Sequence, residues 1–276
     1  ERIILSTFDM REGESTKDIA SMLLKKADEG VKIKILVDGV SGFMRMNGKD
    51  FFYALSSHPN IEIKIYNPLN FIMLWKTQGR MHDKYVIVDE KAFILGGRNT
   101  FDYFIGDYPT DGMSYDREVL IYNTAEKRIE GEKSSLYQLE DYFNSVWESD
   151  VCSYFHDDEK LREDKDVQAI IAELSERYEK IRNDRPELFE AYDYAKNTVA
   201  ANHVELVHNP THIYCKEPVV FYELTELMKH AKKKVTIHTP YAVCNDYMYE
   251  RLREVSGLVD VEMMINSVEN GDNFVA

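Results

Sequence analysis

The sequence predicts an α/β protein with a mixed, mostly parallel sheet flanked by helices. A strand, an amphipathic helix and a second strand follow one another at the start of the chain, and this order implies neighbouring parallel strands with a right-handed crossover. The order recurs near the end of the chain, where KVTIHTP and VDVEMMINS repeat the pattern of RIILSTF and VKIKILVDG. With 276 residues, 44% of them hydrophobic, the chain can bury one large core or two modest ones.

The first β-α-β unit covers residues 2–39. Residues 2–8 have the composition of a buried strand, and Ser15 or Thr16 can cap the helix that follows. That helix ends at Gly30, a residue that commonly stops helices. Residues 31–37 form the next predicted strand, which Asp38 and Gly39 close.

The next elements are a helix over residues 48–57 and a strand over residues 61–66. The loop over residues 69–77 then carries five large apolar side chains, namely Phe71, Ile72, Met73, Leu74 and Trp75. One interpretation is a hydrophobic plug that covers the end of the sheet. The other is an apolar lip suited to acyl chains or to a lipid surface.

Residues 78–99 (QGRMHDKYVIVDEKAFILGGRN) hold the chemistry. Two short strands are predicted over residues 85–88 and 92–95, with a turn at residues 89–91. His82 and Lys84 are two residues apart, so on an extended strand both side chains leave the same face.

The same stretch ends in groups that suit a phosphate. Gly96 and Gly97 let the backbone approach a ligand closely, and Asn99 adds an amide at the same rim. An imidazole, an ammonium, bare backbone and an amide that converge on one spot make a phosphate site. The imidazole of His82 can also act as a nucleophile or a general acid.

Residues 115–122 alternate as a strand, on which Asp116 and Glu118 share a face. A carboxylate is needed here, because a nucleophilic imidazole requires a partner that fixes its tautomer and stabilises its cation. We expect His82 to lie at a sheet end, on a strand next to that of Asp116.

The spacing His-x-Lys, four residues, Asp, six residues, Gly-Gly-x-Asn runs from His82 to Asn99 and closely resembles the signature of the phospholipase D superfamily. The LVDG, YNP and TPY segments are most similar to those of bacterial cardiolipin synthases. The resemblance implies a phosphodiesterase or phosphatidyltransferase that acts on phospholipids through a phosphohistidine, without a metal or cofactor.

The same resemblance assigns roles to individual residues. His82 is the nucleophile, Lys84 and Asn99 stabilise the phosphate oxygens, and Asp116 orients the imidazole, with Glu118 as the reserve. The substrate-binding set is Gly96, Gly97, Arg80 and Arg98, although a surface role for the two arginines is equally open. Asp89 is a structural residue of the motif.

The chain divides into three expected segments. Residues 1–124 form a first repeat with the motif, and residues 125–203 form a connector with helices over 135–146, 166–183 and 186–200. Residues 204–276 begin a second repeat, whose own motif would fall near position ~310 by the same repeat logic. We therefore expect a fragment of a longer two-repeat protein, the alternative being a one-motif protein completed by homodimerisation.

Charge and hydropathy bound the partners. The net charge of −15 opposes general binding to nucleic-acid backbones. No apolar run approaches the roughly 18–20 residues that span a bilayer, so the chain itself reads as soluble with a possible peripheral membrane contact. A membrane-associated full-length protein would take its anchor from outside this chain. Two alternatives stay open, a nuclease of the same superfamily and a non-catalytic phosphate-binding or scaffolding protein.

Overall fold

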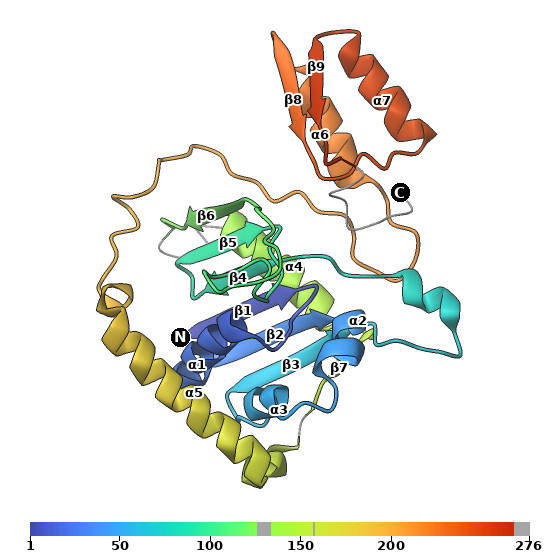
Figure 1. The fold of residues 1–276 in the computed structure, drawn as a ribbon. Helices are drawn as coiled ribbons and strands as arrows, with labels where there is room; N and C mark the ends of the chain where they lie inside the picture. Colours follow the sequence, from blue (N-terminus) through green and yellow to red (C-terminus); the bar gives the residue numbers. More distant parts are fainter. Residues whose placement is uncertain (126–133, 157, 268–276) are drawn as a thin grey trace. The chain divides into compact units, whose positions relative to one another are not determined.

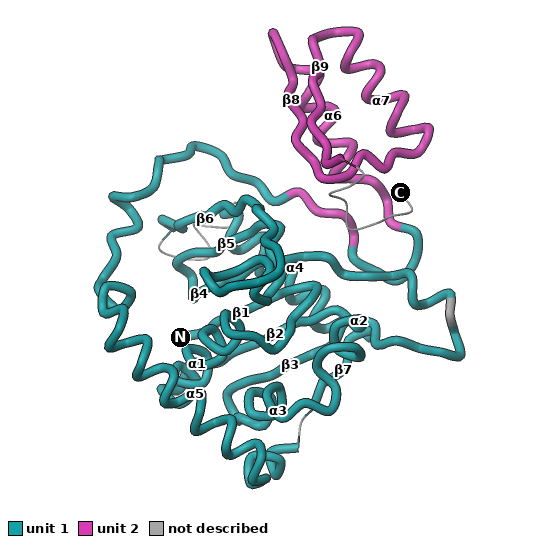
Figure 2. Tube along the Cα trace, viewed as in Figure 1, with its two compact units in different colours: residues 1–206, 211–215 teal, residues 207–210, 216–276 magenta. Residues whose placement is uncertain are grey.

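The computed structural model describes residues 1–125, 134–156 and 158–267. The chain forms two compact units (Figure 2). The first contains residues 1–206 and 211–215, and the second contains residues 207–210 and 216–276.

The first unit is built on a seven-stranded mixed sheet with helices on both faces (Figure 1), which confirms the predicted fold class. The strand order is β6-β5-β4-β1-β2-β3-β7. At its centre, β1 (Arg2–Thr7), β2 (Lys32–Asp38) and β3 (Ile61–Tyr66) are parallel neighbours. The crossover from β1 to β2 is α1 (Glu14–Asp28), as the opening β-α-β pattern predicts.

The outer strands pair in antiparallel fashion. β4 (Tyr85–Val88) lies between β1 and β5 (Ala92–Gly96), and β5 pairs with β6 (Glu118–Tyr122). On the other edge β7 (Cys152–Tyr154) pairs with β3. Among the described strands of this sheet, parallel pairing is confined to β1, β2 and β3. The three-residue turn between β4 and β5 is too short for a parallel crossover, so these two strands are antiparallel neighbours.

Helices cover the two faces of this sheet with separate cores. On one face α1, α3 (Asp50–Ser56) and α5 (Lys165–Asp184) enclose residues such as Ile33, Ile35 and Leu174. On the other face α4 (Ser135–Trp147) packs its aromatic residues against Ile4 and Leu36. Neighbouring residues of β2 thus enter different cores, as the two-residue period of a strand requires.

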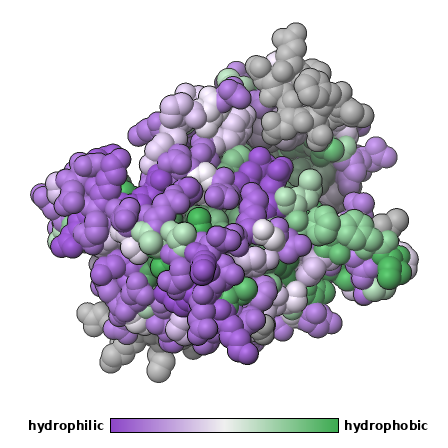
Figure 3. Space-filling view, turned by 60° about the horizontal axis from the view of Figure 1, so that its bottom comes forward, coloured by the Kyte–Doolittle hydropathy of each residue, from purple (hydrophilic) through white to green (hydrophobic). Residues whose placement is uncertain are grey.

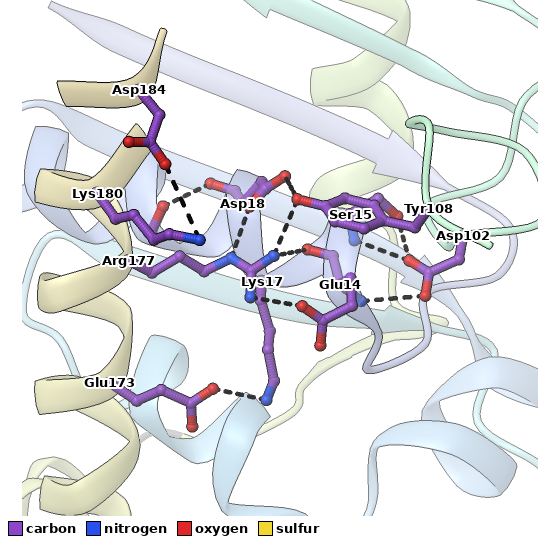
Figure 4. A network of polar contacts seen from close by, with 11 residues as sticks. Glu14, Ser15, Lys17, Asp18, Asp102, Tyr108, Glu173, Arg177, Lys180 and Asp184 are labelled. Atoms are coloured by element: carbon purple, nitrogen blue, oxygen red, sulfur yellow. Dashed lines mark hydrogen bonds and ion pairs between the residues drawn. The ribbon is translucent and has the colours of Figure 1, made fainter. Parts of the chain in front are cut away.

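Within the first unit, Arg177 links α5 to α1 (Figure 4). Its guanidinium donates to Asp18 at 2.6 Å and to Glu14 at 2.8 Å, both on α1, and to the Tyr108 hydroxyl at 3.1 Å. In the same network Asp102 accepts from the backbone N–H and the hydroxyl of Ser15 at the start of α1. Arg177 thereby joins α5, α1 and the loop that leads to β6.

The predicted helices over residues 48–57, 135–146 and 166–183 are confirmed as α3, α4 and α5. The predicted helix over residues 186–200 is wrong, because only the 3-10 turn Pro186–Phe189 forms. Asp193 accepts from the Lys196 N–H, and its carbonyl accepts from the Asn197 side chain. Such local side-chain bonds compete with a regular helix.

The second unit contains α6 (Val219–Lys229), α7 (Asp246–Ser256) and two parallel strands, β8 (Lys234–His238) and β9 (Asp260–Met264). The strand–helix–strand pattern predicted for this region is therefore present. The division of the chain into repeats and a connector stays a prediction, and α4 and β7 belong to the first unit. Within the described ranges, no helix is both long and apolar enough to cross a membrane.

Candidate active site

The motif residues meet where several strands of the first unit's sheet begin or end, and we call this side of the sheet the motif edge. Because β4 is antiparallel to β1, the start of β4 lies beside the end of β1, where Ser6 pairs with Tyr85. β4 and β6 both run antiparallel to β5, so their first residues share that edge with the end of β5. His82 thus lies at a sheet end, as predicted, but its strand is not next to that of Asp116. β5 lies between them, because the chain turns back directly after β4.

Lys84 is the buried cation of this edge. Its side chain is only 7% exposed, and its ammonium donates to the His82 carbonyl at 2.6 Å and to His82 Nδ1 at 3.0 Å. Burial lowers the pKa of Lys84 to about 8, although the carboxylates of Asp83 and Asp116 act in the opposite direction. His82 itself is exposed, and its ring packs against Phe8 with 4.7 Å between centroids. An accessible imidazole therefore stands beside a poorly hydrated ammonium.

Asn99 has a fixed orientation at the same edge. Its Oδ1 accepts from the Asp9 N–H at 3.2 Å, and the Thr100 N–H returns a 2.9 Å bond to the Asp9 carbonyl. The Asp9 carboxylate is in turn bound by Arg11 and by the Ser41 hydroxyl. The amide oxygen of Asn99 therefore accepts from the backbone, and its amide NH2 group can donate to a ligand.

Gly96 and Gly97 lack side chains, so the residues at the start of β6 can pack directly against their backbone. A Cβ on Gly97 would overlap the Asp116 carboxylate, and a Cβ on Gly96 would overlap Glu118. The structure thus gives the two glycines a packing role that the sequence did not suggest. Their predicted role in substrate binding stays a prediction.

Asp116 lies beside Gly97 and acts electrostatically on Lys84. Its Oδ1 accepts from the Arg117 N–H at 2.7 Å, and its carbonyl accepts from the Arg98 guanidinium at 3.2 Å. Arg98 also approaches Glu118 at 3.9 Å. The carboxylate predicted to orient His82 is therefore brought to the site, and the reserve candidate is engaged by Arg98.

Asp38 is a site residue that the sequence reasoning missed. It is fully buried at the end of β2, where burial raises its pKa. It accepts from the Met81 N–H at 2.9 Å and from Arg80 at 3.2 Å, so it holds the backbone one residue before His82. The sequence feature that could have identified it is the Asp38-Gly39 pair at the end of a buried strand, but such a pair is equally typical of a simple turn.

Arg80 completes this support. Besides Asp38, its guanidinium donates to the Asn67 carbonyl at 2.7 Å and to its neighbour Gly79 at 3.0 Å. These contacts tie the loop after β3 to the start of the motif. They favour a structural role for Arg80, and its predicted contact with substrate stays a prediction.

Asp83, between the two central motif residues, is held from α4. The Tyr142 hydroxyl donates to Asp83 and pairs with the Thr211 hydroxyl at 2.6 Å. Sequence spacing gave no sign of this contact, because Tyr142 and Thr211 are distant in the chain. Asp89 lies at the other end of β4, in the turn to β5, where it accepts from the Arg2 N–H at 2.7 Å. Its backbone is left-handed (φ 51°), a conformation that aspartate tolerates better than most residues.

Proteins similar in sequence to this chain are found among bacteria. A cardiolipin synthase of Clostridium perfringens is 27% identical over 269 residues, which cover 95% of this chain and 47% of that protein. An uncharacterized protein of Helicobacter pylori is 28% identical over 99% of this chain and 56% of that protein. The chain thus spans about half the length of these relatives.

Among solved structures, phosphatidylserine synthase of Haemophilus influenzae Rd KW20 superposes on 96% of this chain and 56% of its own, with a TM-score of 0.57 at 12% identity. That similarity supports the fold. Residues 1–147 match the family described as the phospholipase D-like domain of cardiolipin synthase. The resemblance inferred from the motif is therefore confirmed, and the chain belongs to the phospholipase D superfamily.

Proposed function

We propose that the chain is part of a metal-independent phosphodiesterase or phosphatidyltransferase that acts on phospholipids. The observation that carries the proposal is the convergence of His82, Lys84, Asn99 and Asp116 at one sheet edge, with Lys84 buried against the imidazole. The names of the similar proteins, cardiolipin synthase and phosphatidylserine synthase, favour a phospholipid substrate.

In the proposed reaction His82 attacks phosphorus through Nε2, because Nδ1 faces Lys84. A nitrogen–phosphorus bond forms, and the bond from phosphorus to the leaving alkoxide breaks. The alkoxide takes a proton from a general acid, which the resemblance assigns to a second motif. Water or an alcohol then gives its proton to the deprotonated general acid and attacks the phosphorus of the phosphohistidine. The nitrogen–phosphorus bond breaks and His82 is restored, which gives hydrolysis or transfer respectively.

Lys84 and Asn99 supply the electrostatic part of the proposal. An ammonium with little hydration interacts strongly with a phosphate, because competing water has already been removed. While the Lys84 ammonium donates to Nδ1, the proton of the neutral imidazole is on Nε2. When Lys84 turns towards the phosphate it releases Nδ1, and the ring can take the tautomer that has its proton on Nδ1, held by the Asp116 carboxylate, which leaves the Nε2 lone pair free to attack. Asp38 and Arg80 act as positioning residues by fixing the backbone before His82.

The net charge of −15 disfavours the nuclease alternative, since nucleic-acid backbones would be repelled over most of the surface. The scaffolding alternative predicts phosphate binding without turnover. Homodimer formation remains a prediction, so oligomeric state has to be measured in the same preparation.

The test compares His82→Ala with His156→Ala in the complete protein. We expect His82→Ala to lower turnover of a soluble phosphodiester in excess chelator by about 10³-fold or more, and to abolish the acid-labile phosphoprotein. His156 is a matched control, because it follows β7 at the opposite sheet edge and packs against Tyr53.

Comparable losses from both variants would contradict the site assignment. Loss of wild-type turnover in chelator would refute the metal-free mechanism. Phosphate binding by an inactive wild-type protein would favour the scaffolding alternative.

A further inference from the structure

The loop between β3 and the motif projects from the sheet edge that carries His82 and exposes its largest side chains. Ile72 is 89% exposed, Trp75 69% and Phe71 65%. The interpretation of this loop as a plug over the sheet end is therefore wrong for these side chains. Figure 3 shows hydrophobic surface on the right of the molecule, the side towards which this loop extends in Figure 1.

A second segment extends the exposed surface. After β2 the chain forms one π-helical turn, Gly42–Met46, on which Phe43 and Met44 are exposed. Phe43 meets Phe71 edge-on with 5.3 Å between ring centroids. We call these five side chains, Phe43, Met44, Phe71, Ile72 and Trp75, the apolar lip. Since β2 and β3 end at the edge where β4 begins, the apolar lip and the motif share that edge.

The loop is held in this shape by its own polar groups. The Asn67 side chain donates to the carbonyls of Lys76 and Gly79 at 2.7 and 2.8 Å, which closes the base of the loop. At the tip Asn70 Oδ1 accepts from the N–H groups of Ile72 and Met73. Hydrogen bonds thus hold the backbone while the apolar side chains point outward, an arrangement typical of functional surface loops.

The charged residues around the apolar lip indicate which kind of surface it can bind. The chain contains 49 acidic residues, yet none occurs in residues 39–49 or 67–82, which carry four basic ones: Arg45, Lys49, Lys76 and Arg80. Arg80 forms an ion pair with Asp38, and the Lys49 ammonium lies 3.9 Å from the Glu12 carboxylate. Within the described ranges the structure gives Arg45 no acidic partner, whereas Lys76 shares a pocket with Asp150.

Because these two segments contain basic residues and no acidic ones, they meet less electrostatic repulsion from an anionic surface than the rest of the chain, which carries a net negative charge. Aromatic and aliphatic side chains flanked by basic ones are typical of segments that enter the interface of a bilayer. We propose that the apolar lip docks on anionic phospholipid bilayers and inserts Phe71, Ile72 and Trp75 beside the motif edge. The choice of a lipid surface rests on the proposed function.

The chain contains its own reporter for the test. It has two tryptophans, Trp75 in the apolar lip and Trp147, which is 3% exposed in the core. With vesicles of phosphatidylcholine and phosphatidylglycerol, we expect the fluorescence to shift to the blue and to be quenched by chain-brominated lipid. Trp75→Phe should remove both changes.

Flotation with the same vesicles measures affinity. Replacing Phe71, Ile72 and Trp75 together by Ser should weaken partitioning about a hundredfold. Arg45→Glu with Lys76→Glu should weaken it by about fivefold or more for each charge, and mainly on anionic vesicles. The matched control replaces exposed apolar residues elsewhere, Leu188→Ser with Val199→Ser, and should bind as the wild type does.

Unchanged Trp75 fluorescence, or equal partitioning of the lip variants and the wild type, would overturn the inference. So would a spectral shift that depends on protein concentration without lipid, which would identify an interface between copies. His82→Ala should bind vesicles normally, and the lip variants should keep turnover of a soluble phosphodiester. Failure of docking and failure of the proposed chemistry are therefore distinguishable.

Discussion

Lys84 is the residue at which stability and proposed function conflict. Burial lowers its pKa from 10.5 to about 8, so keeping the ammonium that the proposed site requires lowers the stability of the folded chain. Because the folded pKa lies below the unfolded one, the folded state releases this proton first. The contribution of Lys84 to stability therefore improves as pH rises from about 8 to about 10.5.

The first consequence concerns Lys84→Met, which removes the charge and keeps the aliphatic stem. We expect the free energy of unfolding at neutral pH to rise by about 1–3 kcal/mol, while turnover falls by about 10²–10³-fold. Chemical denaturation and a soluble phosphodiester assay measure the two effects. Lys91→Met, at the exposed β4–β5 turn, should change neither. A destabilised Lys84→Met would show that the ammonium is stabilising here.

The second consequence is an alkaline limit on activity. If the protonated ammonium binds phosphate, kcat/KM should fall as pH rises through about 8, the value to which burial brings the pKa of Lys84 in the free protein. A bound phosphate favours the charged form, so the corresponding limit in kcat should lie at higher pH. A pH profile of kcat/KM that stays flat to pH 10 would exclude this role for Lys84.

At the scale of elements, the sequence predicted what local patterns determine. The β1-α1-β2 unit, the hairpin at Asp89 and the shared edge of the motif follow from two-residue and helical periodicities, and the structure contains each of them. Contacts between distant residues could not be predicted. Asp38 supports Met81, and Tyr142 supports Asp83, only because the fold places different strands and helices together. The strand over residues 92–95 was predicted, but its position between the strands that follow His82 and Asp116 was not.

Arg177 gives an element-scale prediction. Its loss leaves Glu14 and Asp18 without the guanidinium that joins α5 to α1. It also removes one hydrogen bond from the Tyr108 hydroxyl, which still donates to Asp18. We expect Arg177→Met to lower the free energy of unfolding by about 1–3 kcal/mol, because removing one partner leaves like charges uncompensated.

The control for Arg177 lies one turn further along α5. Lys180→Met removes an exposed lysine that is 3.9 Å from Asp184 and should change stability by less than about 0.5 kcal/mol. Chemical denaturation measures both variants. Figure 4 draws both residues, and equal effects from the two variants would contradict a specific role for Arg177 in joining α5 to α1.

At the scale of the whole molecule, the two units differ in the quality of their cores. The first unit buries two clusters, one on each face of a seven-stranded sheet. In the described part of the second unit only Thr225 and Val255 are buried, and apolar side chains of α6 and β9, such as Leu227 and Met264, are exposed. A two-stranded sheet with so little buried surface is marginally stable.

Hydrogen exchange should therefore divide the chain along these units. We expect amides of residues 33–37 in β2 to exchange only through global unfolding of the first unit, since both of its neighbouring strands and both cores protect them. Amides of β8 and β9 open at a much smaller free energy, so their protection should be lower by about a hundredfold or more. Mass spectrometry of peptides that cover residues 33–37, 234–238 and 260–264 measures the difference. Equal protection of all three peptides would mean that the second unit is stabilised by contacts that its own exposed apolar side chains do not provide.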